Sequence, residues 1–146
     1  MPHKYQQEID NFSFPPDFTC PNKVKPINEE IIVYRFSINP VSDPLNFLPN
    51  VLFDQNRGIV TKYKKGEEEK VCLRCGASFY LSEDSAKFAW KSAAKKFRNN
   101  SGYTHIAYGK LNSNDGVMSK PHDDHFTFYE DISANLPAKF DILCPL

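Results

Sequence analysis

Two histidines flank two carboxylates in the segment His122-Asp123-Asp124-His125. Imidazole and carboxylate groups this close together can hold a divalent metal, and they can also act as general acids and bases. Because Lys120 and Pro121 come before the segment, we expect an exposed loop that leads into a strand. Two interpretations stay open, a solvated polar loop and the site of a metal-dependent hydrolase.

The four cysteines are the other candidates for chemistry. Cys72 and Cys75 form a C-x-x-C pair, and Cys20 and Cys144 could complete a set of four thiolate ligands for zinc. However, Cys72 and Cys75 lie in an alternating hydrophobic stretch typical of a strand, in which positions i and i+3 point to opposite faces. We therefore predict ordinary reduced thiols and no bound metal, with zinc at Cys72 and Cys75 as the alternative.

The composition limits the class of protein. A chain of 146 residues suits one domain, and its 40% of hydrophobic and 14% of aromatic residues are enough to form a core. The 18 basic residues balance the 18 acidic ones, whereas a general nucleic-acid binder is usually basic. No apolar run is long enough to span a bilayer, and residues 1–11 lack the apolar core of a signal peptide. We therefore expect a soluble, cytoplasmic protein that binds neither membranes nor nucleic acids in general.

The spacing of hydrophobic residues predicts an α+β fold, with a mostly antiparallel sheet of about six short strands and one main amphipathic helix. The helix is predicted over 83–98, after the capping residue Ser82 and before the polar stretch 99–102. The predicted strands are 29–38, 59–64, 71–81, 103–111, 126–129 and 140–143, and a turn at 65–67 joins the second and third as a hairpin.

Two segments outside these elements are rich in proline and aromatic residues. Residues 1–28 are predicted to be an extended arm on the single α+β domain of residues 29–146, and 41–58 is predicted to be a long loop. Exposed apolar side chains on such segments would form a surface for another protein. The candidate contacts are Phe12, Phe14, Phe18, Phe47 and Leu48. Because no complete catalytic set is visible, we predict a small accessory or protein-interaction domain.

The order of three polar residues suggests an alternative function. Arg35 follows Tyr34 on an early strand, Ser78 lies in a strand that runs into the main helix, and Glu130 follows a late strand. This order resembles the Arg, Ser and Glu of ADP-ribosyltransferase-like domains, which include small NAD-consuming bacterial toxins of the RES type. The resemblance implies that Arg35 binds a phosphate of NAD, that Ser78 supports the nicotinamide-ribose pocket, and that Glu130 stabilises positive charge on the ribose.

Overall fold

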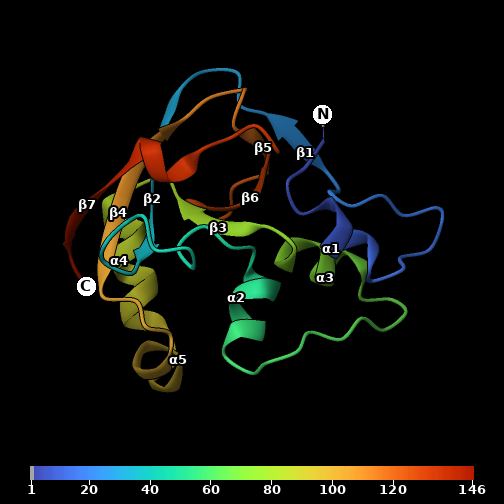
Figure 1. Ribbon diagram of the computed structural model, residues 1–146, viewed down its shortest axis with the longest axis horizontal. Helices are drawn as coiled ribbons and strands as arrows, with labels where there is room; N and C mark the ends of the chain where they lie inside the picture. The colour runs from blue at the N-terminus through green and yellow to red at the C-terminus, as the bar shows by residue number, and fades with distance from the viewer. Residues whose placement is uncertain (1) are drawn as a thin grey trace.

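A seven-stranded sheet runs through the computed structural model, which describes residues 2–146 (Figure 1). The strand order is β1-β5-β6-β3-β2-β4-β7, and every pair of neighbours is antiparallel. The strands are β1 (Val24–Pro26), β2 (Ile31–Ser37), β3 (Ala77–Tyr80), β4 (His105–Leu111), β5 (Gly116–Ser119), β6 (His125–Glu130) and β7 (Phe140–Pro145). With five α-helices around it, this sheet confirms the predicted α+β fold.

The predicted strand at 29–38 is central, as its apolar residues on both faces indicate. It forms β2, which pairs with β4 along its whole length, from Ile31 opposite Leu111 to Ser37 opposite His105. On its other side, β2 pairs with β3 only at Tyr34 and Tyr80. The two strands therefore separate immediately beyond this pair, and the sheet opens between them.

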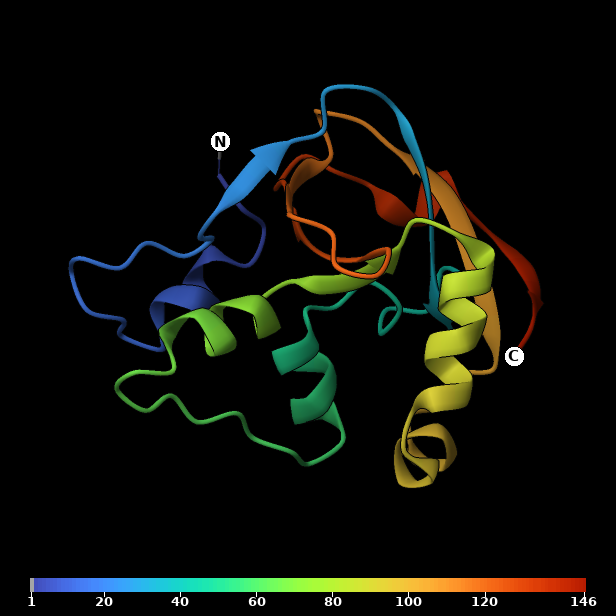
Figure 2. The ribbon, with the colours of Figure 1, turned by 180° about the vertical axis from the view of Figure 1, so that it is seen from behind.

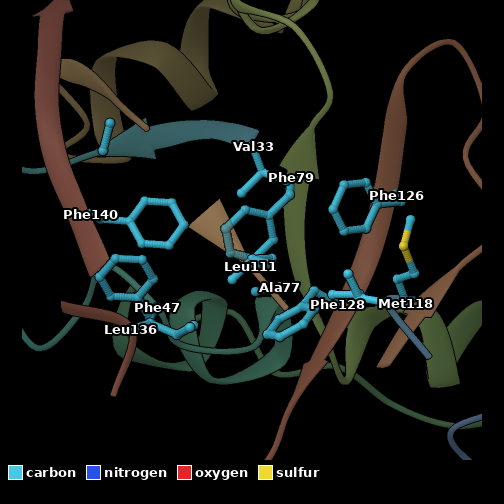
Figure 3. Packing of buried hydrophobic residues seen from close by; sticks show 12 residues of the cluster. Val33, Phe47, Ala77, Phe79, Leu111, Met118, Phe126, Phe128, Leu136 and Phe140 are labelled. Carbon is cyan, nitrogen blue, oxygen red and sulfur yellow. The ribbon is translucent and has the colours of Figure 1, made fainter. Parts of the chain in front are cut away.

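The main core lies against one face of the sheet (Figure 3). Phe79 is fully buried at its centre and packs against three aromatic neighbours, Phe126, Phe128 and Phe140, with ring centroids 5.5–5.9 Å apart. Alternation along β3 places Ala77 and Phe79 in this core. It directs the intervening Ser78 and Tyr80 to the opposite face.

That opposite face carries the helices that line the candidate site. The predicted main helix forms α4 (Glu83–Ser92), and the hydroxyl of Ser82 accepts the backbone N–H of Ser85, which confirms the predicted cap. The helix ends earlier than predicted, because Ala93 and Ala94 are extended and a separate α5 (Lys95–Asn100) follows. In Figure 2, α2 (Asn50–Asn56) and the α4–α5 pair lie on the same side of the sheet. The predicted loop 41–58 therefore contains a helix.

The hairpin predicted between 59–64 and 71–81 is wrong. Residues 59–64 have no regular secondary structure, and the first half of the predicted return strand is helix α3 (Glu68–Arg74). Val71 and Cys72 are the buried residues of this helix, and Cys75, directly after its last residue, is buried as well. Acidic residues in the first turn of α3 and Arg74 in its last turn also suit the helix dipole. This charge pattern favours a helix, whereas the alternating hydrophobic pattern favours the predicted strand.

The N-terminal segment packs against α3. It contains α1 (Gln6–Asp10), and its β1 adds an edge strand to the sheet beside β5. Cys20 forms a disulfide with Cys72 on α3, while Cys75 is buried and unpaired and Cys144 is half-buried and unpaired. The prediction of four reduced thiols is therefore wrong for one pair, since the chain path brings residues 52 positions apart into contact. Disulfides persist mainly in oxidising compartments, so this pair gives no support to the predicted cytoplasmic location.

The helices of residues 2–146 are all too short or too polar to cross a bilayer. Besides the five α-helices, the chain forms a short 3₁₀ helix, η1 (Leu136–Lys139), which leads into β7.

Candidate ligand-binding site

Arg35 occupies the opening between β2 and β3. Its Nε donates to the carbonyl of Phe36 on β2 at 3.2 Å, and its Nη1 donates to the carbonyl of Ser78 on β3 at 3.5 Å. Continuing the antiparallel register from Tyr34 and Tyr80 would place Phe36 opposite Ser78. The guanidinium thus bridges two carbonyls at a level where β2 and β3 do not pair with each other.

This guanidinium is buried without a counter-ion. Arg35 is only 3% exposed, and within residues 2–146 it forms no ion pair with an Asp or Glu. Its Cζ lies 5.4 Å from the ring centre of Phe47 and 5.1 Å from that of Phe79, and its Nη2 donates to the hydroxyl of Tyr103 at 3.5 Å. Burial lowers the pKa of Arg35, although the Tyr103 hydroxyl opposes this shift. The groups that accept hydrogen bonds from Arg35 are all neutral, and the charge of Glu130 acts on the guanidinium without forming an ion pair with it. A buried charge without a contacting counter-ion is costly, which favours a site that attracts an anion.

A cavity of about 260 Å³ lies next to Arg35. Its walls come from β2, β3, α2, the end of α3, the α4–α5 pair and the loop before β4. The lining residues are Arg35, Phe36, Asn50, Phe53, Asp54, Arg74, Ser78, Tyr80, Ala89, Ala93, Phe97 and Tyr103. We call this space the Arg35 cavity.

One wall of the Arg35 cavity is aromatic. The rings of Phe53 and Tyr103 are parallel and stacked, with centroids 4.8 Å apart. Phe36 packs against Tyr80 at 5.6 Å and against Tyr103 at 5.8 Å. Burial raises the pKa of both Tyr80 and Tyr103, so their hydroxyls stay neutral hydrogen-bonding groups. The cavity therefore offers flat apolar surface next to a buried positive charge, a combination that suits a planar ring carrying an anionic group.

The Ser78 of the predicted set lies beside Arg35 in this cavity. Its hydroxyl accepts a hydrogen bond from Nδ2 of Asn50 at 3.1 Å, and the backbone N–H of Asn50 donates to the carbonyl of Gly76 at 2.9 Å. These two bonds attach the start of α2 to β3. They also orient the Ser78 hydroxyl at the cavity wall.

The third residue of the predicted set, Glu130, does not line the Arg35 cavity. It ends β6, is 5% exposed, and its Oε2 pairs with Nζ of Lys4 at 3.1 Å. The backbone of Lys4 also donates to the carbonyl of Glu130, so the N-terminal segment covers this carboxylate. Burial raises the pKa of Glu130, and the charges of Lys4 and, less strongly, Arg35 oppose the shift. The structure thus brings together Arg35 and Ser78 but leaves Glu130 outside.

The His-Asp-Asp-His segment is a tight hairpin turn. His122 and His125 exchange both backbone hydrogen bonds, at 2.8 and 2.9 Å, and Asp123 and Asp124 between them have φ values of 50° and 63°. Two-residue hairpins of type I′ require positive φ at both turn positions, and Asp tolerates this conformation. The spacing of the histidines therefore follows from the turn. Within residues 2–146, no three His, Cys, Asp or Glu side chains are placed to hold a metal together, at this turn or at Cys72 and Cys75.

The predicted partner-binding residues differ in how deeply they are buried. Phe12, Phe14 and Phe18 are half-buried against the cluster that contains the disulfide. Phe47 is only 7% exposed and belongs to the main core, while Leu48 is half-buried. A protein partner stays a prediction, but Phe47 is not available on the surface to bind one.

The inward position of Phe47 has a local cause in Asn46. This side chain is fully buried, donates to the carbonyls of Ile38, Pro40 and Val41, and accepts the N–H of Ile38. It thereby closes the loop after β2 and directs Phe47 over Arg35.

Sequence reasoning missed several residues of the Arg35 cavity. Asn50, Asp54 and Arg74 lie on α2 and α3, helices that were not predicted there, and Tyr103 lies in the loop before β4. Only Tyr80 had a usable signal, because it shares a strand face with Ser78. A comparison of the chain with family models, with curated proteins and with solved structures finds no match to any of them.

Proposed function

We propose that this protein binds NAD, or a nucleotide closely related to it, in the Arg35 cavity. The observation that carries the proposal is the buried guanidinium of Arg35, which faces a cavity and has no carboxylate partner. A phosphate oxygen of the ligand would supply the missing negative charge through charge-assisted hydrogen bonds.

Two further features support a nucleotide over a simple inorganic anion. The stacked pair Phe53 and Tyr103, together with Phe36 and Tyr80, provides flat surfaces for a ring. Ser78 and Asn50 add hydroxyl and amide groups that can bond to a ribose or a carboxamide. Of the lining residues, Arg35 and Ser78 are the two to which the resemblance to ADP-ribosyltransferase-like domains assigns the phosphate and the nicotinamide-ribose pocket.

The proposal concerns binding first, because the carboxylate that the resemblance assigns to catalysis is outside the cavity. Asp54 is the one carboxylate that lines the Arg35 cavity among residues 2–146, and Arg57 and Arg74 both pair with it. A carboxylate held by two guanidinium groups is a weak base and a weak nucleophile. We therefore expect tight binding of NAD, with slow or no release of nicotinamide.

Calorimetric titration with NAD tests the proposal. The wild type should bind NAD, and Arg35→Gln should weaken the affinity by about 100-fold because it removes the charged donor. Arg98→Gln on α5 is the matched control, since Arg98 does not line the cavity, and it should bind like the wild type. Absence of NAD binding by the wild type, or equal binding by Arg35→Gln, would overturn the proposal.

A further inference from the structure

A second arginine, Arg74, also lines the Arg35 cavity. Arg74 is the last residue of α3, and its side chain is 38% exposed. Its Nη2 pairs with Oδ2 of Asp54 on α2, and Oδ1 of the same carboxylate accepts from Nη1 of Arg57 at 3.3 Å. One carboxylate is thus shared by two arginines.

The charges around the cavity do not balance. Two of the lining residues, Arg35 and Arg74, are positively charged. Among residues 2–146, Asp54 is the one negatively charged lining residue, and it forms ion pairs with both Arg74 and Arg57. When Arg74 turns toward a ligand, Asp54 keeps Arg57 as its partner and is not left as an unpaired charge. Arg74 can therefore turn to an anion without leaving Asp54 unpaired. Arg57 stacks over Phe53 and Phe97 and does not itself line the cavity.

We propose that Arg74 is a second anion-binding residue of the Arg35 cavity, so that the site selects ligands with two adjacent phosphates. One phosphate contacts Arg35 and the other contacts Arg74. Guanidinium groups match phosphate oxygens with two parallel hydrogen bonds, which gives each contact a defined geometry. The inference rests on the proposed function, since it uses the same cavity, but it assigns a residue that neither the predicted set nor the resemblance includes.

Calorimetry with four ligands separates this inference from the proposed function. Inorganic phosphate and pyrophosphate probe the two-phosphate preference without a ring, while AMP and ADP carry one and two phosphates on the same adenosine. We expect the wild type to bind each two-phosphate ligand at least about tenfold more tightly than its one-phosphate counterpart. In Arg74→Gln this preference should disappear, and the affinity for one-phosphate ligands should change by less than about threefold.

Two variants control for structure and charge. Arg57→Gln removes no lining residue but leaves Arg74 as the arginine that pairs with Asp54, so it should weaken the preference for two phosphates, though less than Arg74→Gln does. Arg74→Lys keeps the charge but loses the paired donors, so it should retain part of the preference. Thermal unfolding of each variant checks that the fold is intact.

The outcomes distinguish the two proposals. If NAD binds through Arg35 but Arg74→Gln keeps the full preference for two phosphates, the role of Arg74 is wrong and the proposed function stands. If pyrophosphate binds with the expected dependence on Arg74 but NAD does not bind, the nucleotide proposal is wrong and the second anion site stands. If the wild type shows no preference for two phosphates, the inference about Arg74 is overturned.

Discussion

Arg35 and Glu130 are both buried charges at the sheet, but their surroundings differ. Arg35 faces a cavity, bonds to two carbonyls and a tyrosine hydroxyl, and lacks an acidic partner within residues 2–146. Glu130 pairs with Lys4, lies under the N-terminal segment, and lines no part of that cavity. Both residues belong to the predicted catalytic set, and only one of them is placed to meet a ligand.

The difference shows that burial of a charge does not by itself mark a functional site. A buried ion that has its own counter-ion is part of the structure, whereas one that faces open space without a counter-ion is ready for an external one. The N-terminal segment makes Glu130 a structural residue, because it contributes the counter-ion Lys4 and covers the carboxylate.

Removal of the disulfide should have the largest effect on stability. The Cys20–Cys72 bond ties the segment that contains Lys4 to α3, and it closes a loop of 52 residues. We expect the double variant Cys20→Ser, Cys72→Ser to lose about 4 kcal/mol of unfolding free energy in urea titration. Cys144→Ser, which removes an unpaired thiol, is the control and should lie close to the wild type. Where the double variant is folded, its NAD affinity should stay within about threefold of the wild type.

Stabilisation of the native state by NAD should show directly which of the two charged residues, Arg35 or Glu130, contacts the ligand. At a concentration of 100 times the dissociation constant, a ligand that binds only the native state adds about 2.7 kcal/mol to the unfolding free energy. NAD should therefore raise the melting temperature of the wild type and of Glu130→Gln by a similar amount. Arg35→Gln should show almost no rise at the same NAD concentration. An equal rise in all three proteins would mean that neither charge contacts the ligand.

Loss of Lys4 should leave Glu130 as an unpaired buried charge. We expect Lys4→Gln to lose about 2 kcal/mol at neutral pH, less than a fully enclosed pair would lose because the Lys4 side chain is 41% exposed. The matched control is Lys23→Gln, which breaks a pair between two exposed side chains, Lys23 and Glu69, and should cost less than about 0.5 kcal/mol. Equal losses in the two variants would show that Glu130 is not effectively buried.

Neutralising Glu130 should give the smallest effect, with the opposite sign. Burial raises the native pKa of Glu130 above its ordinary value of 4.5, so stability falls as the pH rises from 4.5 through the native pKa. Glu130→Gln cannot ionise, so above that window we expect it to be more stable than the wild type by about 1 kcal/mol. Below pH 4.5 the two proteins should converge. Urea titrations across this pH range measure the difference, and a constant difference would contradict the proposed desolvation of Glu130.

The parts of the fold with strong local patterns were predictable. The apolar residues on both faces of 31–37 indicated a central strand, and the helical period after Ser82 indicated α4 with its cap. The short strands β4, β6 and β7 also coincide with predicted strands. In contrast, residues 71–74 carry both an alternating and a helical pattern. The helix forms because it buries Val71 and Cys72, and Cys72 packs with residues of the N-terminal segment.

For the candidate site, the sequence allowed a prediction of some of its residues and their order along the chain, but not of their positions in space. Arg35 and Ser78 could be chosen because they lie on strands that were recognisable. The position of Glu130 could not be judged from the sequence, because it depends on Lys4, which is 126 residues away. The same holds for Asp54 and Arg74, which meet only because α2 and α3 lie side by side.

The amino-acid sequence by itself determined the fold class, the central strand and the capped main helix, because these follow from hydrophobic periods and capping within short stretches of chain. Only the tertiary structure decided which buried charges have partners, which cysteines pair and which residues share a cavity. These depend on contacts between residues far apart in the chain, and local patterns carry no information about such contacts. By sequence, Arg35 is a strand residue, and it becomes a candidate ligand contact only because β2 and β3 separate beside it.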